Sequence, residues 1–417
     1  MTESLCRAPW IVCQIGAREH YALARALHQR GRLAQLITDV WVPPGSLLRL
    51  LPGTAGVRLK SRFDDALAQA DVAHFTHEFL GRDVWQKFER QAGKWGVIVS
   101  RNERFQSVAS AYLRSNDFLK GRGAPKPVVF AYSYAAREIF IEAKRRGAQT
   151  VLGQIDGGIS DARYIESIRL KEAHKWPKVE PPPAAYWDNW FEECRLADKI
   201  VVNSIWSREL LLQAKIGPEK IAVVPVIYEQ KNALSDRPKD YPATFSQSRP
   251  MRVLLLGSLL ARKGVLEALA AADELSGEPV EFWFVGSDPE GHGDHARRCK
   301  NIKWIPAVPR PEASKYYKYA DAFLFPTHSD GFGMTQVEAQ NYGLPVIASK
   351  QCGQVVEDGV SGIVLPEVSK DAIATVLRGL QSRPELLREM SAASRLKLSR
   401  YSGKVVLDQL FSSIASR

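Results

Sequence analysis

Two adjacent cations, Arg262 and Lys263, stand in the segment GSLLARKG between residues 257 and 264. An apolar run ends at Gly257 and a helix is expected to begin near Gly264, so both cations fall just after the carboxyl end of a predicted strand. Two cations at such a point can neutralise a leaving diphosphate without a metal ion. The alternative is a pair of surface cations at the start of a helix.

A small-residue loop and the helix after it combine glycines with two carboxylates. Glycines let the backbone approach a ligand closely, and the start of a helix near Gly333–Thr335 offers unpaired N–H groups to a phosphate. Asp330 lies in the loop, and Glu338 lies inside the helix, eight residues on. Carboxylates there suit the vicinal hydroxyls of a sugar. The alternative makes Asp330 a loop cap and Glu338 a solvated helix residue.

The N-terminal part of the chain offers weaker candidates. Asp156 lies near the end of the run TVLGQIDGG and could hydrogen-bond a sugar hydroxyl, although an ordinary Asp-Gly turn explains it equally well. Gly16 follows the first apolar run and would let phosphates approach the backbone. Arg18, Glu19 and His20, next to it in the chain, could touch a ligand.

These residues need a scaffold that brings strand ends together. Short β-branched apolar runs alternate with amphipathic stretches, which predicts parallel strands joined by crossover helices. The first set of predicted strands covers residues 10–16, 72–77, 96–100, 127–133, 150–156, 199–204 and 220–226. The pattern stops in the polar, proline-bearing stretch 228–250. It restarts with predicted strands at 252–258, 280–287, 302–306, 322–327, 345–349 and 362–366.

The alternation predicts an α/β protein with two tandem Rossmann-like parallel-sheet domains that face a central cleft. We expect an N-terminal domain at 1–235, a C-terminal domain at 250–390, and a C-terminal helix within 391–417 that packs back on the N-terminal domain. The first loops of the two domains read IGAREHY and GSLLARKG, and neither has the G-x-G-x-x-G spacing of a dinucleotide-dependent oxidoreductase.

Composition narrows the class of protein. The chain has 417 residues, 45% hydrophobic and 25% charged, which is typical of a folded protein with more than one domain. It has no apolar run long enough to span a membrane, its N-terminus is a poor signal peptide, and its five cysteines are scattered. We therefore expect a cytoplasmic protein with reduced thiols and no zinc site.

Positive charge is concentrated in the N-terminal part. Residues 1–250 hold 37 Lys and Arg against 27 Asp and Glu, whereas 251–417 hold 20 against 19, and 101–150 alone hold 10 against 4. A phosphorylated substrate, an anionic membrane face and nucleic acid are all candidate partners, and a basic solvated surface is the alternative. Because no nucleic-acid-binding module is recognisable, we expect no nucleic-acid partner.

The stretch from 320 to 349, ADAFLFPTHSDGFGMTQVEAQNYGLPVIAS, resembles the signature of the glycosyl transferases group 1 family, family 4 of the GT-B nucleotide-sugar transferases. Residues 352–366 and the segment ADKIVVNSIWSRELL at 197–211 resemble two further elements of this family. The resemblance covers residues 195–390 well and the N-terminal domain loosely. The matching positions of the signature are Ala320, Asp321, Pro326, Gly331, Phe332, Gly333, Glu338, Ala339, Gly343, Pro345, Val346 and Ser349.

The resemblance implies a donor site in the C-terminal domain and an acceptor site in the N-terminal domain. The donor would be a nucleotide-sugar such as a UDP- or GDP-sugar, with no cofactor and no metal. Glu338 would bind the ribose, Asp330 would face the donor sugar, and Lys263 would meet the diphosphate, with Arg262 as its helper. The other donor-binding positions would be Gly331, Phe332, Gly333, Met334, Thr335, Gly16, Ser258 and, near the base, Ile305.

Three positions depart from the family pattern. Ser258 stands where the family has an arginine, Asp156 where it often has a histidine, and Asp330 where it has the first glutamate of an E-x7-E pair. We expect a retaining, metal-independent hexosyltransferase of polysaccharide biosynthesis, with Asp330, Lys263, Arg262 and Asp156 in catalysis. The alternative is a catalytically inactive nucleotide-sugar-binding scaffold.

The acceptor is expected to be a hydroxyl of a glycan, a lipid-linked molecule or a small molecule. The basic segment 101–150 suggests an anionic acceptor or peripheral contact with the inner face of the membrane. A second polar cluster, Asp288, Glu290, His292, Asp294 and His295, superficially resembles a metal site, but its glycine-rich surroundings favour a solvated loop.

Overall fold

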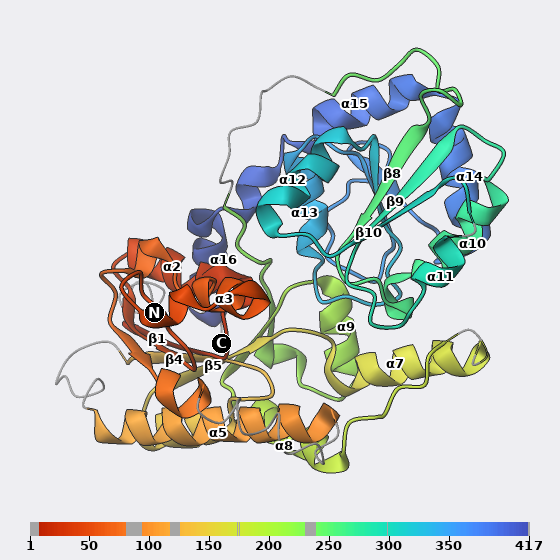
Figure 1. The fold of residues 1–417 in the computed structure, drawn as a ribbon. Helices are drawn as coiled ribbons and strands as arrows, with labels where there is room; N and C mark the ends of the chain where they lie inside the picture. The colour runs from red at the N-terminus through yellow and green to blue at the C-terminus, as the bar shows by residue number, and fades with distance from the viewer. Residues whose placement is uncertain are drawn as a thin grey trace.

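The computed structural model describes residues 8–80, 94–116, 126–172, 174, 176–229, 239–297 and 299–415. They form two lobes, each built on a parallel sheet with helices packed against it (Figure 1). The N-terminal sheet has seven strands in the order β3-β2-β1-β4-β5-β6-β7, and the C-terminal sheet has six in the order β10-β9-β8-β11-β12-β13. Every strand pair is parallel. The predicted fold class, with two Rossmann-like domains, is confirmed.

The N-lobe sheet is buried on both faces, as a parallel sheet with crossover helices must be. Successive residues of a strand point to opposite faces, so Ile11 and Cys13 join one core while Trp10 and Val12 join the other. The strands are β1 (Trp10–Gln14), β2 (Leu33–Thr38), β3 (Val72–His74), β4 (Val128–Tyr132), β5 (Gln149–Gln154), β6 (Lys199–Val202) and β7 (Ile221–Val223). The helices are α2 (Ala22–Gln29), α3 (Gly53–Lys60), α5 (Lys94–Ser115), α6 (Arg137–Arg145), α7 (Gly158–Lys171), α8 (Ala184–Leu196) and α9 (Ile205–Gln213).

The C-lobe follows the same plan. Val253 and Leu255 of its central strand pack under α10 and α14, and Leu254 faces the core that α12 and α13 cover. The strands are β8 (Met251–Leu256), β9 (Val280–Gly286), β10 (Ile302–Pro306), β11 (Ala322–Phe325), β12 (Val346–Ala348) and β13 (Gly362–Val364). The helices are α10 (Val265–Glu274), α11 (Gly293–Ala296), α12 (Arg310–Tyr319), α13 (Met334–Asn341), α14 (Lys370–Gln381) and α15 (Pro384–Ser394), and the last helix of the chain is α16 (Gly403–Ala415).

The last helix leaves the C-lobe and returns to the N-lobe. Leu407 and Phe411 of α16 lie in the same core as Trp10, whose ring centroid is 5.7 Å from that of Phe411. Arg30, just after α2, pairs with Asp408 of α16 at 3.0 Å. Helix α16 therefore covers one face of the N-terminal sheet beside α2, and the chain crosses between the lobes twice. Among the described residues, no helix has both the length and the apolar character to cross a bilayer.

Two features of the N-lobe differ from the sequence expectation. The prediction of a strand at 96–100 is wrong, because these residues lie in α5, where Phe105, Ala109 and Leu113 recur at helical spacing and are buried. Strand β2 was absent from the predicted set because the buried Gln35 interrupts its apolar run. The Gln35 amide donates to Asp71 and to the Tyr112 hydroxyl, both at 2.9 Å. Residues 230–238 of the predicted linker lie outside the described residues.

Candidate active site

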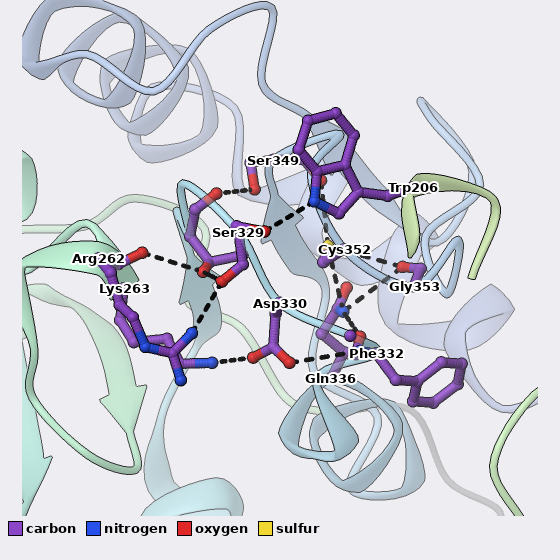
Figure 2. Close-up of polar contacts among 12 residues, drawn as sticks. Trp206, Arg262, Lys263, Ser329, Asp330, Phe332, Gln336, Ser349, Cys352 and Gly353 are labelled. Atoms are coloured by element: carbon purple, nitrogen blue, oxygen red, sulfur yellow. Dashed lines mark hydrogen bonds and ion pairs between the residues drawn. The ribbon is translucent and has the colours of Figure 1, made fainter. Parts of the chain in front are cut away.

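The two lobes meet along the loop that follows β11. The Trp206 indole of α9 donates to the Ser329 hydroxyl at 2.8 Å (Figure 2), and the Ser207 hydroxyl donates to the Gly331 carbonyl at 3.4 Å. Gly331 lies so close to the N-lobe that a Cβ added to it would stand 2.2 Å from the carbonyl oxygen of Ile155. The carboxyl ends of β5 and β11 therefore face each other across a narrow gap, where ligands bind in doubly wound folds.

A cavity of about 410 Å³ lies in this gap. The N-lobe contributes Glu19, Ile155 and Asn203 to its wall. The C-lobe contributes eight of the residues singled out from the sequence, namely Ser258, Arg262, Lys263, Asp330, Phe332, Gly333, Met334 and Thr335.

Strand ends and a tight turn place the cations in this cavity. Arg262 and Lys263 lie in a short 3₁₀ helix, Ala261–Lys263, which ends at Gly264 with φ 74°. A Cβ at Gly264 would stand 1.9 Å from the carbonyl oxygen of Pro326, so only glycine allows the two loops to approach this closely. The turn that precedes α10 is thereby held against the loop that carries Asp330.

Lys263 and Asp330 form an ion pair inside the cavity (Figure 2). The second oxygen of Asp330 accepts the Phe332 backbone N–H at 3.3 Å, and Arg262 donates to the Ser329 carbonyl at 3.0 Å. Burial and the nearby Arg262 guanidinium lower the pKa of Lys263, and the Asp330 carboxylate is the counter-charge in direct contact with it. Arg262 adds a second positive charge, so this wall favours an anion with more than one negative charge.

Backbone amides extend the same wall. Gly333, with φ 83°, begins α13, so the first N–H groups of this eight-residue helix lie beside the cavity. The Gln336 amide donates to the Phe332 carbonyl at 2.9 Å and holds the loop in place. A Cβ at Gly333 would stand 2.6 Å from the Phe325 ring. The loop is thus fixed in a form that presents N–H donors next to Lys263, an arrangement suited to phosphate.

Glu338 lines a second cavity, of about 500 Å³. Its carboxylate pairs with Arg310 at 2.9 Å and accepts the Tyr317 hydroxyl at 2.9 Å, both from α12. His20 of the N-lobe and Tyr228 complete part of the wall, so Glu338 faces the gap between the lobes. Asp330 and Glu338 therefore serve neighbouring cavities, and not one shared pocket.

One N-lobe loop reaches both cavities. Glu19, His20 and Tyr21 all have positive φ, at 50°, 53° and 58°, which is costly for non-glycine residues. This strained turn sends Glu19 into the first cavity and His20 into the second. Burial raises the pKa of Glu19, whose carboxylate accepts the Tyr132 hydroxyl at 3.5 Å.

Four of the expected catalytic and donor-binding residues, Gly331 among them, line neither cavity. Gly16 donates its N–H to the buried Asp39 at 2.8 Å. One oxygen of Asp156 accepts the Tyr134 hydroxyl at 2.5 Å, the Gln154 amide at 3.0 Å and the Gly158 N–H at 3.0 Å. Ile305 packs, partly buried, on the core around β9 and β11.

The C-terminal lobe matches the model of the family described as Glycosyl transferases group 1, over residues 236–397. The chain is therefore similar to the glycosyl transferases group 1 family over residues 236–397. The match includes both cations, Asp330 and Glu338.

Relatives of this chain carry transferase names. A protein of Segniliparus rotundus named D-inositol 3-phosphate glycosyltransferase is 30% identical over 235 residues, which cover 52% of each chain. One of the same name from Streptomyces griseus is 30% identical over 332 residues, covering 78% of this chain and 62% of the relative. The chain thus spans about half the length of the first of these relatives and less than two thirds of the second.

Solved structures show that the fold is GT-B. Anabaena HepE, solved in complex with UDP and glucose, has a TM-score of 0.62 at 15% identity and covers 98% of this chain with all of its own length. A glycosyltransferase from Rickettsia africae has a TM-score of 0.59 at 15% identity and covers 98% of this chain. Both lobes of this chain therefore share the architecture of these proteins.

The structure adds Arg310 and Tyr317 to the candidate site. In the sequence, only their position points to the site, because α12 follows β10 and so begins at the sheet edge that carries the other site residues. The loop of Asp288 and Glu290, which superficially resembles a metal site in the sequence, supports the turn that carries the two cations. Glu290 accepts the Ala261 N–H at 2.6 Å, and Asp288 accepts backbone N–H groups of its own loop. Within the described ranges, no group of three His, Cys, Asp or Glu side chains is placed to hold a metal ion.

Proposed function

We propose that this protein is a glycosyltransferase that moves a sugar from a nucleotide-sugar donor to an acceptor hydroxyl. One observation carries the proposal: Lys263, Arg262 and the amino end of α13 line a single cavity, next to a second cavity that holds Glu338. A nucleoside diphosphate has the matching order of groups, with hydroxyls at one end and a diphosphate at the other. The match of residues 236–397 to the family model supports this assignment.

The cavity walls suit the departure of a nucleoside diphosphate. When the bond between the sugar C1 and the diphosphate oxygen breaks, its electron pair stays on that oxygen, where Lys263, Arg262 and the α13 amides stabilise the added charge. The acceptor hydroxyl oxygen forms the new bond to C1, and its proton goes to a phosphate oxygen of the leaving group. In this front-face scheme the configuration at C1 is retained. The gap between the lobes limits the access of water that would hydrolyse the donor.

A UDP-sugar is the donor that we propose, with a GDP-sugar as the alternative. Support comes from HepE, which has the same fold and was solved with UDP and glucose and with UDP-glucose. In this assignment Glu338 accepts hydrogen bonds from the ribose hydroxyls, while Arg310 and Tyr317 hold its carboxylate in place. Asp330 faces the sugar hydroxyls at the border of the cation pair.

The acceptor that we propose is an anionic hydroxyl compound, free or lipid-linked. Asp39, fully buried after β2, pairs with Arg101 at 2.6 Å and with Arg62 at 3.5 Å. These two guanidinium groups carry one more positive charge than the carboxylate they share, beside the loop of Gly16. Relatives named for D-inositol 3-phosphate, an anionic polyol, support this class. We propose no nucleic-acid partner and no cofactor, and a cytoplasmic site of action.

Ligand-induced stabilisation tests the donor assignment. We expect UDP, and no other nucleoside diphosphate to the same degree, to raise Tm by roughly 5 °C at 100 times its Kd. Glu338→Ala should weaken UDP binding about tenfold but leave the affinity for 2′-deoxy-UDP less affected, since the lost contact is to the ribose. Glu389→Ala, an exposed change in α15, is the control.

Transfer separates the enzyme from the inactive scaffold. A glycosyltransferase hydrolyses or transfers from its UDP-sugar, and Lys263→Ala reduces that rate, whereas a scaffold binds UDP with no turnover. If no nucleoside diphosphate changes Tm, the donor site itself is wrongly assigned.

A further inference from the structure

A compact loop of residues 43–61 protrudes from the N-lobe between β2 and β3. Its base is closed by the Val42 N–H, which donates to the Arg62 carbonyl at 3.0 Å. The loop holds a 3₁₀ helix, Leu47–Leu50, and α3, which pack against each other (Figure 1). Leu48 and Leu59 anchor it on the N-lobe core. It is therefore a formed surface feature with its own packing.

The outer side of this loop displays large aliphatic side chains. Leu47 is 81% exposed, Leu50 77%, Leu51 46% and Val57 62%. All four lie within eleven residues, whereas their neighbours Leu48 and Leu59 turn inward. Large apolar side chains exposed singly are ordinary, whereas four within one short loop mark a surface that meets an apolar environment. We call Leu47, Leu50, Leu51 and Val57 the aliphatic tip.

Positive charge surrounds the aliphatic tip. Residues 40–63 contain no Asp or Glu but contain Arg49, Arg58, Lys60 and Arg62. Arg58 and Lys60 are exposed and form no ion pair with a described residue. The combination of apolar side chains with unpaired cations is complementary to the headgroup and acyl boundary of an anionic bilayer.

The basic segment 101–150 is a poorer match for a membrane. Arg114, Arg145 and Arg146 surround the buried Glu142, whose pKa their hydrogen bonds lower to about 2. Arg101 pairs with Asp39. Much of the positive charge of segment 101–150 is thus neutralised by carboxylates within the N-lobe.

We propose that the aliphatic tip inserts into the headgroup region of an anionic membrane and docks the protein there. A second copy of this chain is a worse occupant, because a two-fold contact would set Arg58 and Lys60 against their own copies. The base of the loop also adjoins the acceptor side, since a Cβ at Gly16 would stand 2.5 Å from Arg62 Nη1. Docking through the tip would hold that side near lipid-linked molecules. The contact itself does not depend on the proposed transfer reaction.

Co-sedimentation with vesicles tests the proposal on the full chain. We expect binding at low salt to vesicles of equal parts phosphatidylglycerol and phosphatidylcholine, and little binding to phosphatidylcholine alone. The double variant Leu47→Ser with Leu50→Ser should bind at least roughly tenfold more weakly. Leu396→Ser, at a C-lobe leucine that is also 77% exposed, should bind like wild type. Arg58→Gln with Lys60→Gln should reduce the salt dependence.

Retention of the wild-type Tm by the variants shows that the fold is intact, since the changed side chains are exposed. The proposal is overturned if wild type does not sediment with the anionic vesicles, or if the leucine variant binds them as tightly as wild type does. It is also overturned if the leucines instead drive self-association without lipid, seen as a dimer that the double variant abolishes.

Discussion

The ammonium group of Lys263 and the carboxylate of Asp330 form an ion pair across the wall of the cavity to which we assign the donor. Each side chain is only 19% exposed, so the pair lies largely out of water. A diphosphate that binds Lys263 must therefore either share the ammonium group with the Asp330 carboxylate or displace that carboxylate from it. Removing one partner of a buried pair leaves the other charge uncompensated, which is destabilising.

We expect Asp330→Asn to lower the Tm of the ligand-free protein, because it leaves Lys263 without its counter-charge. UDP should then stabilise this variant more than it stabilises wild type, since the diphosphate supplies the missing negative charge. Lys263→Ala should have the opposite effect and weaken UDP binding about 10- to 100-fold. Thermal shifts with and without UDP, and calorimetric Kd values, measure both changes.

Asp294→Asn is the matched control, because Asp294 belongs to an ion pair whose side chains are more than three quarters exposed. A UDP-induced shift for Asp330→Asn no larger than that of wild type would show that the diphosphate does not reach Lys263.

Glu193 has a structural role that the sequence concealed. It is fully buried, and its two oxygens accept the backbone N–H groups of Tyr134 and Ala136, each at 2.7 Å. Tyr134 has φ 73°, so this carboxylate helps hold a strained turn after β4. Glu193→Gln should lower the free energy of unfolding by about 1–3 kcal/mol, because the amide NH₂ then faces a backbone N–H.

The effect of Glu193 depends on pH. Burial raises its pKa from 4.5 to about 7. Its folded-state pKa is thus higher than its unfolded one, so its protonation stabilises the fold below pH 4.5, and this contribution is lost as pH rises through 7. Urea unfolding between pH 5 and 8 should show a loss in wild type that is smaller in Glu193→Gln. Glu192→Gln, at the half-buried residue before it, should keep the wild-type dependence.

Alternating apolar runs predicted nearly all of the strands, because a parallel strand buried on both faces needs continuous apolar sequence. The run at 96–100 misled because three β-branched residues in a row resemble such a strand until the helical spacing of Phe105, Ala109 and Leu113 is weighed against them. Gln35 concealed β2, because its partners Asp71 and Tyr112 are distant in sequence.

The residue types of the candidate site were predictable from the sequence, but the division of the site into two cavities was not. Asp330 and Glu338 are eight residues apart, and the left-handed turn at Gly333 separates them, so spacing does not reveal that they face different cavities. Arg310 and Tyr317, which hold Glu338, come from another helix and share no local motif with it. Such pairings arise only when the sheet brings strand ends together.

At Asp156, a structural role in the turn after β5 and a role in the donor site can be tested separately. One of its oxygens accepts three hydrogen bonds, and an Asn carbonyl oxygen in the same place can keep two of them. Asp156→Asn should therefore keep Tm within roughly 2 °C of wild type. If the second oxygen meets the donor sugar, as the sequence led us to expect, the same change lowers kcat/KM for transfer about tenfold while the Kd for UDP is unchanged.

Asp188→Asn, at an exposed residue of α8, is the control for Asp156→Asn. If Asp156→Asn transfers the sugar at the wild-type rate, Asp156 has a role in the turn only.

Closure of the lobes on the donor is testable at Gly331. A Cβ there would stand 2.2 Å from the Ile155 carbonyl oxygen of the opposite lobe, and Gly331 has no positive φ that would strain alanine by itself. Gly331→Ala should therefore push the lobes apart without unfolding either one.

We expect kcat/KM for transfer to fall at least tenfold in Gly331→Ala, since a wider gap admits water and misplaces the acceptor. We also expect the radius of gyration in solution scattering to rise. Gly277→Ala, with nothing within 4 Å of the added Cβ, should change neither quantity, and equal behaviour of the two variants would show that this contact does not govern closure.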